Sequence, residues 1–273
     1  MSDTFNFKRF WTYFKYDLKQ MWRNHSKAAI MIGGSIAIVY FIWVLLSLVF
    51  NQQWTAPSLG ARIATYFAAY TILVLYQTRT YGYLTDKRAG SSWLMLPASR
   101  TEKYVSMLLM TLVVIPILFI TVFLLLDGIL SLLDPGYGQT LIGAFTSNWS
   151  DIVNSYANDS LLKNPIAPII VLILISIFIN FLYYLLCGIC FKKNKIVAGI
   201  AISFGLSVVI STILGLVFRM LGGSSFNIDI DINNDLEGAR FVVGILNGIE
   251  ALGILIVIGL AWGIWRRLKT IQH

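Results

Sequence analysis

The chain has 273 residues, of which 57% are hydrophobic and only 12% are charged. Soluble domains carry about 25% charged residues, so this composition excludes an ordinary soluble protein and predicts an integral membrane protein. The formal net charge of +8 would also suit a nucleic-acid-binding protein. The basic residues are distributed as in a membrane protein, however, and we expect no nucleic-acid partner.

Residues 1–27 predict an amphipathic helix that lies flat in the cytoplasmic headgroup layer of a membrane. Aromatic and apolar side chains recur at the spacing of one helical face, and lysine and arginine occupy the remaining surface. The apolar positions are Phe7, Phe10, Trp11, Phe14, Leu18, Met21 and Trp22. The following apolar run begins near Ala28, after this basic segment, so we expect a retained anchor and not a cleaved signal peptide.

Six apolar runs meet or approach the roughly 20 residues that a spanning helix needs. We expect membrane spans at residues 28–50, 60–78, 104–126, 168–191, 196–221 and 241–265. The predicted fold class is an all-α integral membrane protein with six transmembrane helices. Arg62 lies near the outer end of the second run, where its side chain is expected to reach the interface. The third run continues to Leu133 if it passes Asp127, with a bend expected at Pro116.

The distribution of charge predicts the orientation of these spans. If both termini are cytoplasmic, the cytoplasmic segments are 1–27, 79–104, 192–195 and 266–273, and they hold 17 of the 21 basic residues. Eight of the 13 acidic residues fall in the outer segments. An excess of lysine and arginine marks cytoplasmic loops. We therefore expect the basic side to face anionic lipid, most simply in a bacterial cytoplasmic membrane.

Two outer loops, residues 134–166 and 222–240, are long and polar. The first is rich in asparagine and serine and has room for a short helix. The second contains Asp229, Asp231 and Asn233, as in the first half of a calcium-binding loop. It has Asn234 where such a loop needs glycine and Arg240 where it needs glutamate. We therefore expect an acidic solvated loop and no metal site.

Glu250 is an ionisable residue inside the last predicted span, with Asn247 one turn earlier. A charged group at that depth is costly, so such residues often belong to a transport pathway. The alternative is a structural hydrogen bond across helices, for example to Asn180 or Tyr183 of the fourth span. Both interpretations of Glu250 remain open from the sequence.

Small residues recur every fourth position along the fifth predicted span, and two more follow in the sixth. The first set is Gly199, Ser203, Ser207, Ser211 and Gly215, and the second is Gly244 and Gly248. Such stripes let helices approach closely in lipid. They predict packing of the fifth span against the sixth, or alternatively a surface for a second subunit or for a substrate pathway.

The cytoplasmic loop 79–103 contains an apolar patch in a basic surround. The patch is formed by Trp93, Leu94, Met95 and Leu96, with Gly90 before it and Pro97 after it. Glycine and proline stop or redirect a helix. The loop therefore predicts either a short helix that docks on a partner or an amphipathic segment on the lipid surface.

No catalytic motif is present in the sequence. Both histidines fall in predicted cytoplasmic tails, and there is no glycine–lysine phosphate loop, HExxH or GxSxG sequence. We expect a chain that is not an enzyme and binds no cofactor. Cys187 and Cys190 lie in an apolar run and are expected to be small packing residues.

The loop resembles that of permease subunits in the ABC type-2 family of ABC exporters. The shared features are the charged cluster Asp86-Lys87-Arg88, then Gly90, and then the run from Leu94 to Arg100, followed by Lys103. Members also have six spans, cytoplasmic termini and an amphipathic helix before the first span. Many members have short apolar re-entrant helices between spans five and six, whereas residues 222–240 are acidic here.

The resemblance implies a subunit that exports a lipid, peptide or other amphipathic substrate from the cytoplasm or inner leaflet. It implies a separate ABC ATPase subunit, which binds ATP and magnesium, and a second permease subunit. Residues at the contact with the ATPase would be Arg88, Gly90, Trp93, Leu94, Leu96, Pro97 and Arg100. The alternative is a non-transporting membrane scaffold or assembly factor.

Overall fold

The computed structural model describes residues 5–50, 56–85, 90, 93, 95–158, 166–222 and 235–270. All secondary structure in these residues is helical, which confirms the predicted all-helical fold. Five segments are long and apolar enough to cross a membrane, or six if a bent pair of helices counts as one. These segments indicate a membrane-embedded protein.

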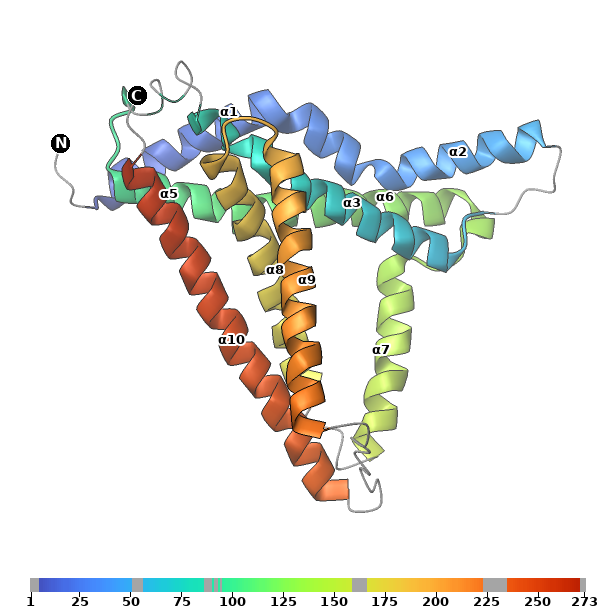
Figure 1. The fold of residues 1–273 in the computed structure, drawn as a ribbon. Helices are drawn as coiled ribbons and strands as arrows, with labels where there is room; N and C mark the ends of the chain where they lie inside the picture. The colour runs from blue at the N-terminus through green and yellow to red at the C-terminus, as the bar shows by residue number, and fades with distance from the viewer. Residues whose placement is uncertain are drawn as a thin grey trace.

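The helices form two groups that meet at one corner of the molecule and diverge from it (Figure 1). The first group contains α1 (Phe7–Gly33), α2 (Ser35–Val49), α3 (Leu59–Thr80), α5 (Arg100–Leu109) and α6 (Ile115–Leu133). The second contains α8 (Ile166–Cys190), α9 (Lys195–Gly222) and α10 (Asp235–Thr270). Between the groups in sequence, α7 (Leu141–Asn158) leaves the first group on the side away from α10.

The structure has no helix break at residue 28, the expected boundary between an interfacial helix and a first span. One continuous helix, α1, runs to Gly33, and α2 follows at an angle of 48°. A Cβ atom at Gly33 would lie 2.9 Å from Cγ1 of Val122 in α6, and one at Gly34 would lie 2.8 Å from the Ile30 carbonyl oxygen. Glycines at these positions therefore permit both the bend and the close packing on α6.

The third span also differs from its expected shape. A π-helical turn, Met110–Val114, links α5 to α6 just before Pro116. Proline lacks a backbone N–H and its ring crowds the preceding turn, and a wider turn accommodates both effects. The span then continues to Leu133, past Asp127. The segment after it, predicted to be an outer loop, contains a short 3-10 turn, η3 (Pro135–Tyr137), and the helix α7.

The two groups are joined where α8 crosses α3. A Cβ atom at Gly188 would lie 2.6 Å from the carbonyl oxygen of Thr78, so the two backbones are in direct contact. One apolar core lies between the first group and α8 and includes Phe119 and Phe123 of α6 and Phe181 of α8. A second core fills the corner where the groups meet and includes Leu185, Ile264 and Trp93. The corner is therefore a packed part of the molecule.

Candidate functional site

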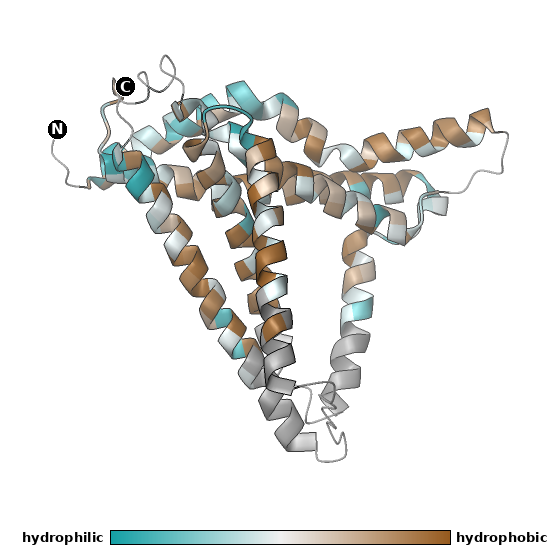
Figure 2. Cartoon of the chain, in the orientation of Figure 1, coloured by the Kyte–Doolittle hydropathy of each residue, from teal (hydrophilic) through white to brown (hydrophobic). Residues whose placement is uncertain are grey.

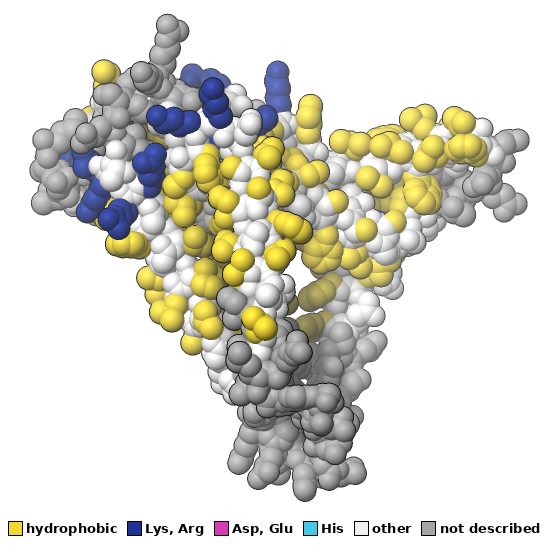
Figure 3. Space-filling view, in the orientation of Figure 1, with side chains coloured by type: hydrophobic (Ala, Val, Ile, Leu, Met, Phe, Trp, Pro, Cys, Tyr) yellow, Lys and Arg dark blue, Asp and Glu magenta, His cyan; other side chains and the backbone are white. Residues whose placement is uncertain are grey.

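The four segments predicted to share one side of the membrane gather at the corner where the two helix groups meet (Figure 1). We call this region the basic corner and define it as the first half of α1, residues 81–103, the start of α9 and the end of α10. Lysine and arginine side chains cluster over it (Figure 3), and its helices are hydrophilic there (Figure 2). Which side of the membrane the basic corner faces stays a prediction.

Glu102 joins α5 to the start of α1. Its side chain and that of Ser99 form a reciprocal capping box at the start of α5. Its Oε1 atom also accepts hydrogen bonds from the Asn6 backbone N–H at 2.9 Å and from Arg9 Nη2 at 2.7 Å. The Glu102 side chain is fully buried, whereas that of Arg9 is 34% exposed. One carboxylate therefore fixes the ends of two helices to each other.

Trp93 fixes the loop between α3 and α5 onto α1. Its side chain is 5% exposed, and its Nε1 atom donates a hydrogen bond to the Tyr13 hydroxyl at 3.1 Å. The Lys103 ammonium donates to the Trp93 carbonyl oxygen at 2.8 Å and lies 4.8 Å from the centre of the indole ring. These contacts combine a hydrogen bond with a cation–π interaction. The Trp93 side chain is therefore buried within the chain, and its predicted contact with a partner stays a prediction.

Asp17 provides a further connection beneath the loop. It is 5% exposed and accepts hydrogen bonds from the Tyr81 hydroxyl and from Ser106 Oγ, both at 2.8 Å. Tyr81 follows α3, and Ser106 belongs to α5. Asp17, in the middle of α1, therefore links this helix to α5 and to the residue that follows α3.

The second helix group is tied to the same corner. The Lys195 ammonium, at the start of α9, donates hydrogen bonds to the Gly82 carbonyl and to Thr85 Oγ1. The Tyr104 hydroxyl of α5 donates to the Ala261 carbonyl oxygen of α10 at 2.9 Å. Its ring lies 5.1 Å from that of Trp265. A displacement of the loop would therefore move helices of both groups.

The described residues of the loop differ in their exposure. The Met95 side chain is 80% exposed, Pro97 and Arg100 are exposed, Leu96 is half-buried and Gly90 is buried. A surface groove of about 510 Å3 lies between this loop and α1. It is lined by Asn6, Lys8, Arg9, Thr12, Tyr13, Tyr16, Leu96 and Pro97. Arg88 and Leu94 lie outside the described residues.

A second polar cluster, which we call the outer cluster, lies at the far end of α3 and α6. The Arg62 Nη1 atom is 3.2 Å from Asp127 Oδ1, and these side chains are 4% and 1% exposed. Asp127 also accepts hydrogen bonds from the Tyr137 hydroxyl at 3.1 Å and from the Leu141 backbone N–H at 2.6 Å. The expectation that Arg62 extends to the interface is therefore wrong.

Tyr137 completes the outer cluster from the short turn η3. The Arg62 guanidinium carbon lies 4.3 Å from the centre of the Tyr137 ring, a cation–π contact. Burial and the neighbouring Asp127 carboxylate raise the pKa of Tyr137. Its hydroxyl therefore remains a hydrogen-bond donor to Asp127. The outer cluster fixes the start of α7 to α3 and α6.

Glu250 does not form either of the expected cross-helix hydrogen bonds. Its Oε1 atom is buried and has no hydrogen-bond partner among the described residues. Asn180 donates to the Ser176 carbonyl of its own helix, and the Tyr183 hydroxyl donates to the Gly199 carbonyl of α9. Asn247 is exposed. The expected structural hydrogen bond from Glu250 to Asn180 or Tyr183 is therefore not formed in the structure. A role for Glu250 in a transport pathway stays a prediction.

The contacts of the described residues do not bring the two small-residue stripes together. In these residues α9 packs on α8 and α3, and α10 packs on α8, so the expected packing of the fifth span on the sixth stays a prediction. Gly199 is buried against Tyr184, whereas Ser207, Ser211, Gly244 and Gly248 are exposed. The surroundings of Gly215 are outside the described part of the chain. A subunit or pathway surface stays a prediction.

Sequence reasoning missed the polar residues that hold the basic corner and the outer cluster together. Tyr13 and Asp17 lie off the predicted aromatic stripe of the first helix, yet both are buried. A usable signal existed for Glu102, because serine at position 99 followed three residues later by glutamate matches a capping box. Asp127 and Arg62 are 65 positions apart, and no local pattern predicts that pairing.

Comparisons with known proteins identify no relative. The chain matches no protein-family model, and searches of curated proteins and of solved structures found no match. The resemblance to ABC exporter permeases therefore rests on the loop motif and on the predicted topology.

Proposed function

We propose that the chain is the membrane-spanning permease subunit of an ABC-type exporter. It moves a lipid, peptide or other amphipathic substrate out of the cytoplasm or inner leaflet. A separate ATPase subunit, carrying ATP and magnesium, supplies the energy, and a second permease subunit completes the pathway. The basic corner faces the cytoplasm and receives the ATPase.

The observation that carries this proposal is a loop with an exposed tip and a buried base. Met95 projects into solvent, while Trp93, two residues away, is locked to Tyr13 and Lys103. A force applied at the tip passes directly into α1 and α5, because the base is held by packing and hydrogen bonds. Coupling between distant sites needs such a contiguous network. A loop that only rested on lipid would not need it.

The surface around the tip also suits a protein partner. Met95 is an exposed apolar side chain, with the basic Arg100 nearby in sequence and the groove beside Leu96 lined by Lys8 and Arg9. Interfaces are enriched in methionine and arginine. The groove fits an acidic partner segment with an apolar anchor, since positive and negative surfaces steer such encounters.

One observation favours the alternative of a non-transporting membrane scaffold. Trp93 is the largest apolar side chain of the loop, and it is buried within the chain. Buried aromatics are frequent hot spots of protein interfaces, so the loop offers a partner a smaller anchor than the sequence implies. A scaffold needs a stable corner and has no requirement for an ATPase.

The experiment uses a double variant that carries both Met95→Glu and Arg100→Glu. Its control is the single variant Met95→Leu. We expect the double variant to lose about thirtyfold in affinity for its ATPase, if the tip contributes roughly 2 kcal/mol. Both side chains are exposed, so thermal stability should not change. Co-purification from membranes, with the ATPase identified by its glycine–lysine phosphate loop, measures the loss.

The control variant should retain the ATPase at wild-type stoichiometry, since leucine replaces methionine at similar volume. Retention of a fully stimulated ATPase by the double variant would contradict the permease proposal. Absence of any ATPase from the wild-type preparation would favour the scaffold.

A further inference from the structure

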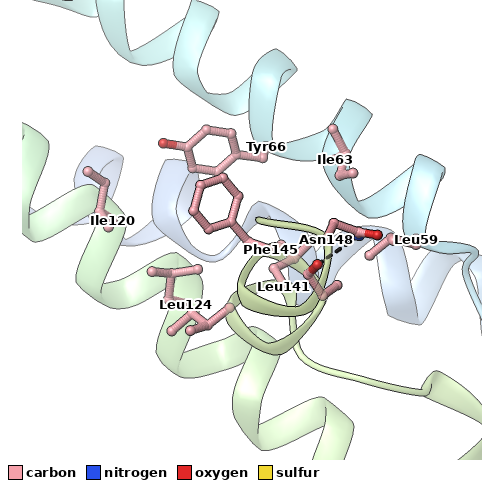
Figure 4. A pocket seen from close by; sticks show the side chains of 10 residues that line it. Leu59, Ile63, Tyr66, Ile120, Leu124, Leu141, Phe145 and Asn148 are labelled. Atoms are coloured by element: carbon pink, nitrogen blue, oxygen red, sulfur yellow. Dashed lines mark hydrogen bonds between the residues drawn. The ribbon is translucent and has the colours of Figure 1, made fainter. Parts of the chain in front are cut away.

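An apolar pocket of about 430 Å3 lies between α3, α6 and α7, beside the outer cluster (Figure 4). Ligand pockets have volumes of roughly 300–1,000 Å3. The side chains of Tyr66 from α3 and Phe145 from α7 both line the pocket, and Ile120 and Leu124 approach from α6. The other lining residues are Leu59, Ile63, Leu141, Ile142, Ala144 and Asn148.

The walls of the pocket select against a polar ligand. Among the described residues no charged side chain lines it, and the polar side chains in its walls are Tyr66 and Asn148. The Asn148 amide donates its hydrogen bond to the Ala144 carbonyl of its own helix at 2.7 Å. The Tyr66 ring packs edge-on against Phe123, with centroids 5.2 Å apart. A water molecule needs two to four polar partners, which these walls do not offer.

The outer cluster holds the third wall in place. The Leu141 backbone N–H, at the first residue of α7, donates to Asp127 at 2.6 Å. The side chain of Leu141 lines the pocket. Ala144, one turn later, is 7% exposed. The pocket is therefore formed by helices that are joined by buried polar bonds, and it does not depend on a loose surface contact.

The pocket opens toward the medium that surrounds the spans. Ile63, Ile142 and Phe145 at its edge are 42%, 53% and 65% exposed. The helices α3 and α6 belong to segments that are long and apolar enough to cross a membrane, and lipid hydrocarbon surrounds the apolar part of a spanning helix. If the pocket were empty, the atoms that line it would lack van der Waals contacts on that side. A flexible apolar chain from the bilayer fills it without leaving a polar group unpaired.

We propose that this pocket binds an acyl chain of a membrane phospholipid. The walls accept the hydrocarbon chain, and the headgroup remains outside the pocket. The site is independent of the proposed export function, because it requires neither the basic corner nor an ATPase. A lipid bound here contacts α3, α6 and α7 together. It is therefore a specifically bound lipid and not one of the annular lipids that exchange with the bilayer.

Photolabelling tests this site on the full chain. The protein is reconstituted in vesicles of phosphatidylethanolamine and phosphatidylglycerol that contain a phospholipid with a diazirine on its acyl chain. Peptide mapping after irradiation should find label concentrated on residues 59–66 and 141–148. The exposed face of α6 at Ile117 and Leu125, which are 57% and 61% exposed but outside the pocket, should carry much less label. Equal labelling of all exposed apolar positions would overturn the proposal.

Variants that fill the pocket sharpen the test. Ile120→Trp replaces an aliphatic side chain of the pocket with a bulkier indole ring, and Ile117→Trp on the same helix is the matched control. We expect pocket labelling to fall about tenfold in the first, equivalent to a loss of ~1.4 kcal/mol in binding, and to stay unchanged in the control. If Ile120→Trp fails to fold, Ile63→Trp fills the pocket from α3 instead.

Three outcomes would contradict the proposal. Undiminished pocket labelling in both filled variants would show that the label does not report the pocket. Displacement of the label by free fatty acid, but not by excess unlabelled phospholipid, would assign the pocket to a free fatty acid. Crosslinks from Phe145 to a second copy of the chain, in place of lipid, would make this face a subunit interface.

Discussion

The basic corner and the outer cluster both contain a charge pair, yet the two pairs differ in what surrounds them. At the basic corner Glu102 is buried, but its partner Arg9 remains 34% exposed. In the outer cluster Arg62 and Asp127 are 4% and 1% exposed. Water can replace the lost contacts of Arg9, whereas Arg62 has no such replacement. Breaking the Arg62–Asp127 pair should therefore cost more free energy than breaking the Arg9–Glu102 pair. The outer cluster is the more rigid connection of the two.

Removal of Asp127 should produce the largest effect on stability. Asp127→Leu leaves the Arg62 guanidinium buried without its partner, and breaking a buried pair in this way costs about 4 kcal/mol. The variant that carries both Arg62→Met and Asp127→Leu removes both charges, so it should recover the part of the loss that comes from the unpaired Arg62, but not the part that comes from the lost hydrogen bonds of Tyr137 and Leu141. Thermal unfolding in detergent measures both. A double variant as unstable as the single variant would show that the charge pair is not what stabilises this joint.

Truncation of Trp93 should have a somewhat smaller effect, confined to the basic corner. Trp93→Ala removes a buried ring and should cost about 3 kcal/mol of unfolding free energy. Trp93→Phe keeps an aromatic ring beneath Lys103 but loses the hydrogen bond to Tyr13, so it should cost only about 1 kcal/mol. Thermal unfolding again measures the difference. Unchanged stability of Trp93→Ala, together with loss of the ATPase, would instead make Trp93 a direct partner contact.

The long apolar helices were predictable because their signal is local. A run of roughly 20 apolar residues identifies a membrane helix whatever it packs against, and α8 and α9 begin within two residues of the expected spans. The bend at Gly34 was not predicted, because it depends on how closely α6 approaches at Val122. The sequence shows the two glycines but does not show the neighbouring helix.

The candidate site was predictable in position but not in detail. The loop was located by its basic residues and by Trp93, both of which are visible in the sequence. The burial of Trp93 follows from Tyr13, 80 positions earlier, and no periodic pattern connects the two. The same holds for Asp127, which looked like an interfacial residue because its distance from Arg62 in the sequence conceals their contact.

A photo-crosslinking amino acid placed at Met95 tests most directly whether the exposed loop meets an ATPase. The matched position is Leu132, which is 86% exposed at the opposite end of the first helix group. In native membranes we predict a crosslink from Met95 to a protein with a glycine–lysine phosphate loop, and none from Leu132. A crosslink to such an ATPase from Leu132, or its absence at Met95 while the complex remains intact, would contradict the proposed coupling surface.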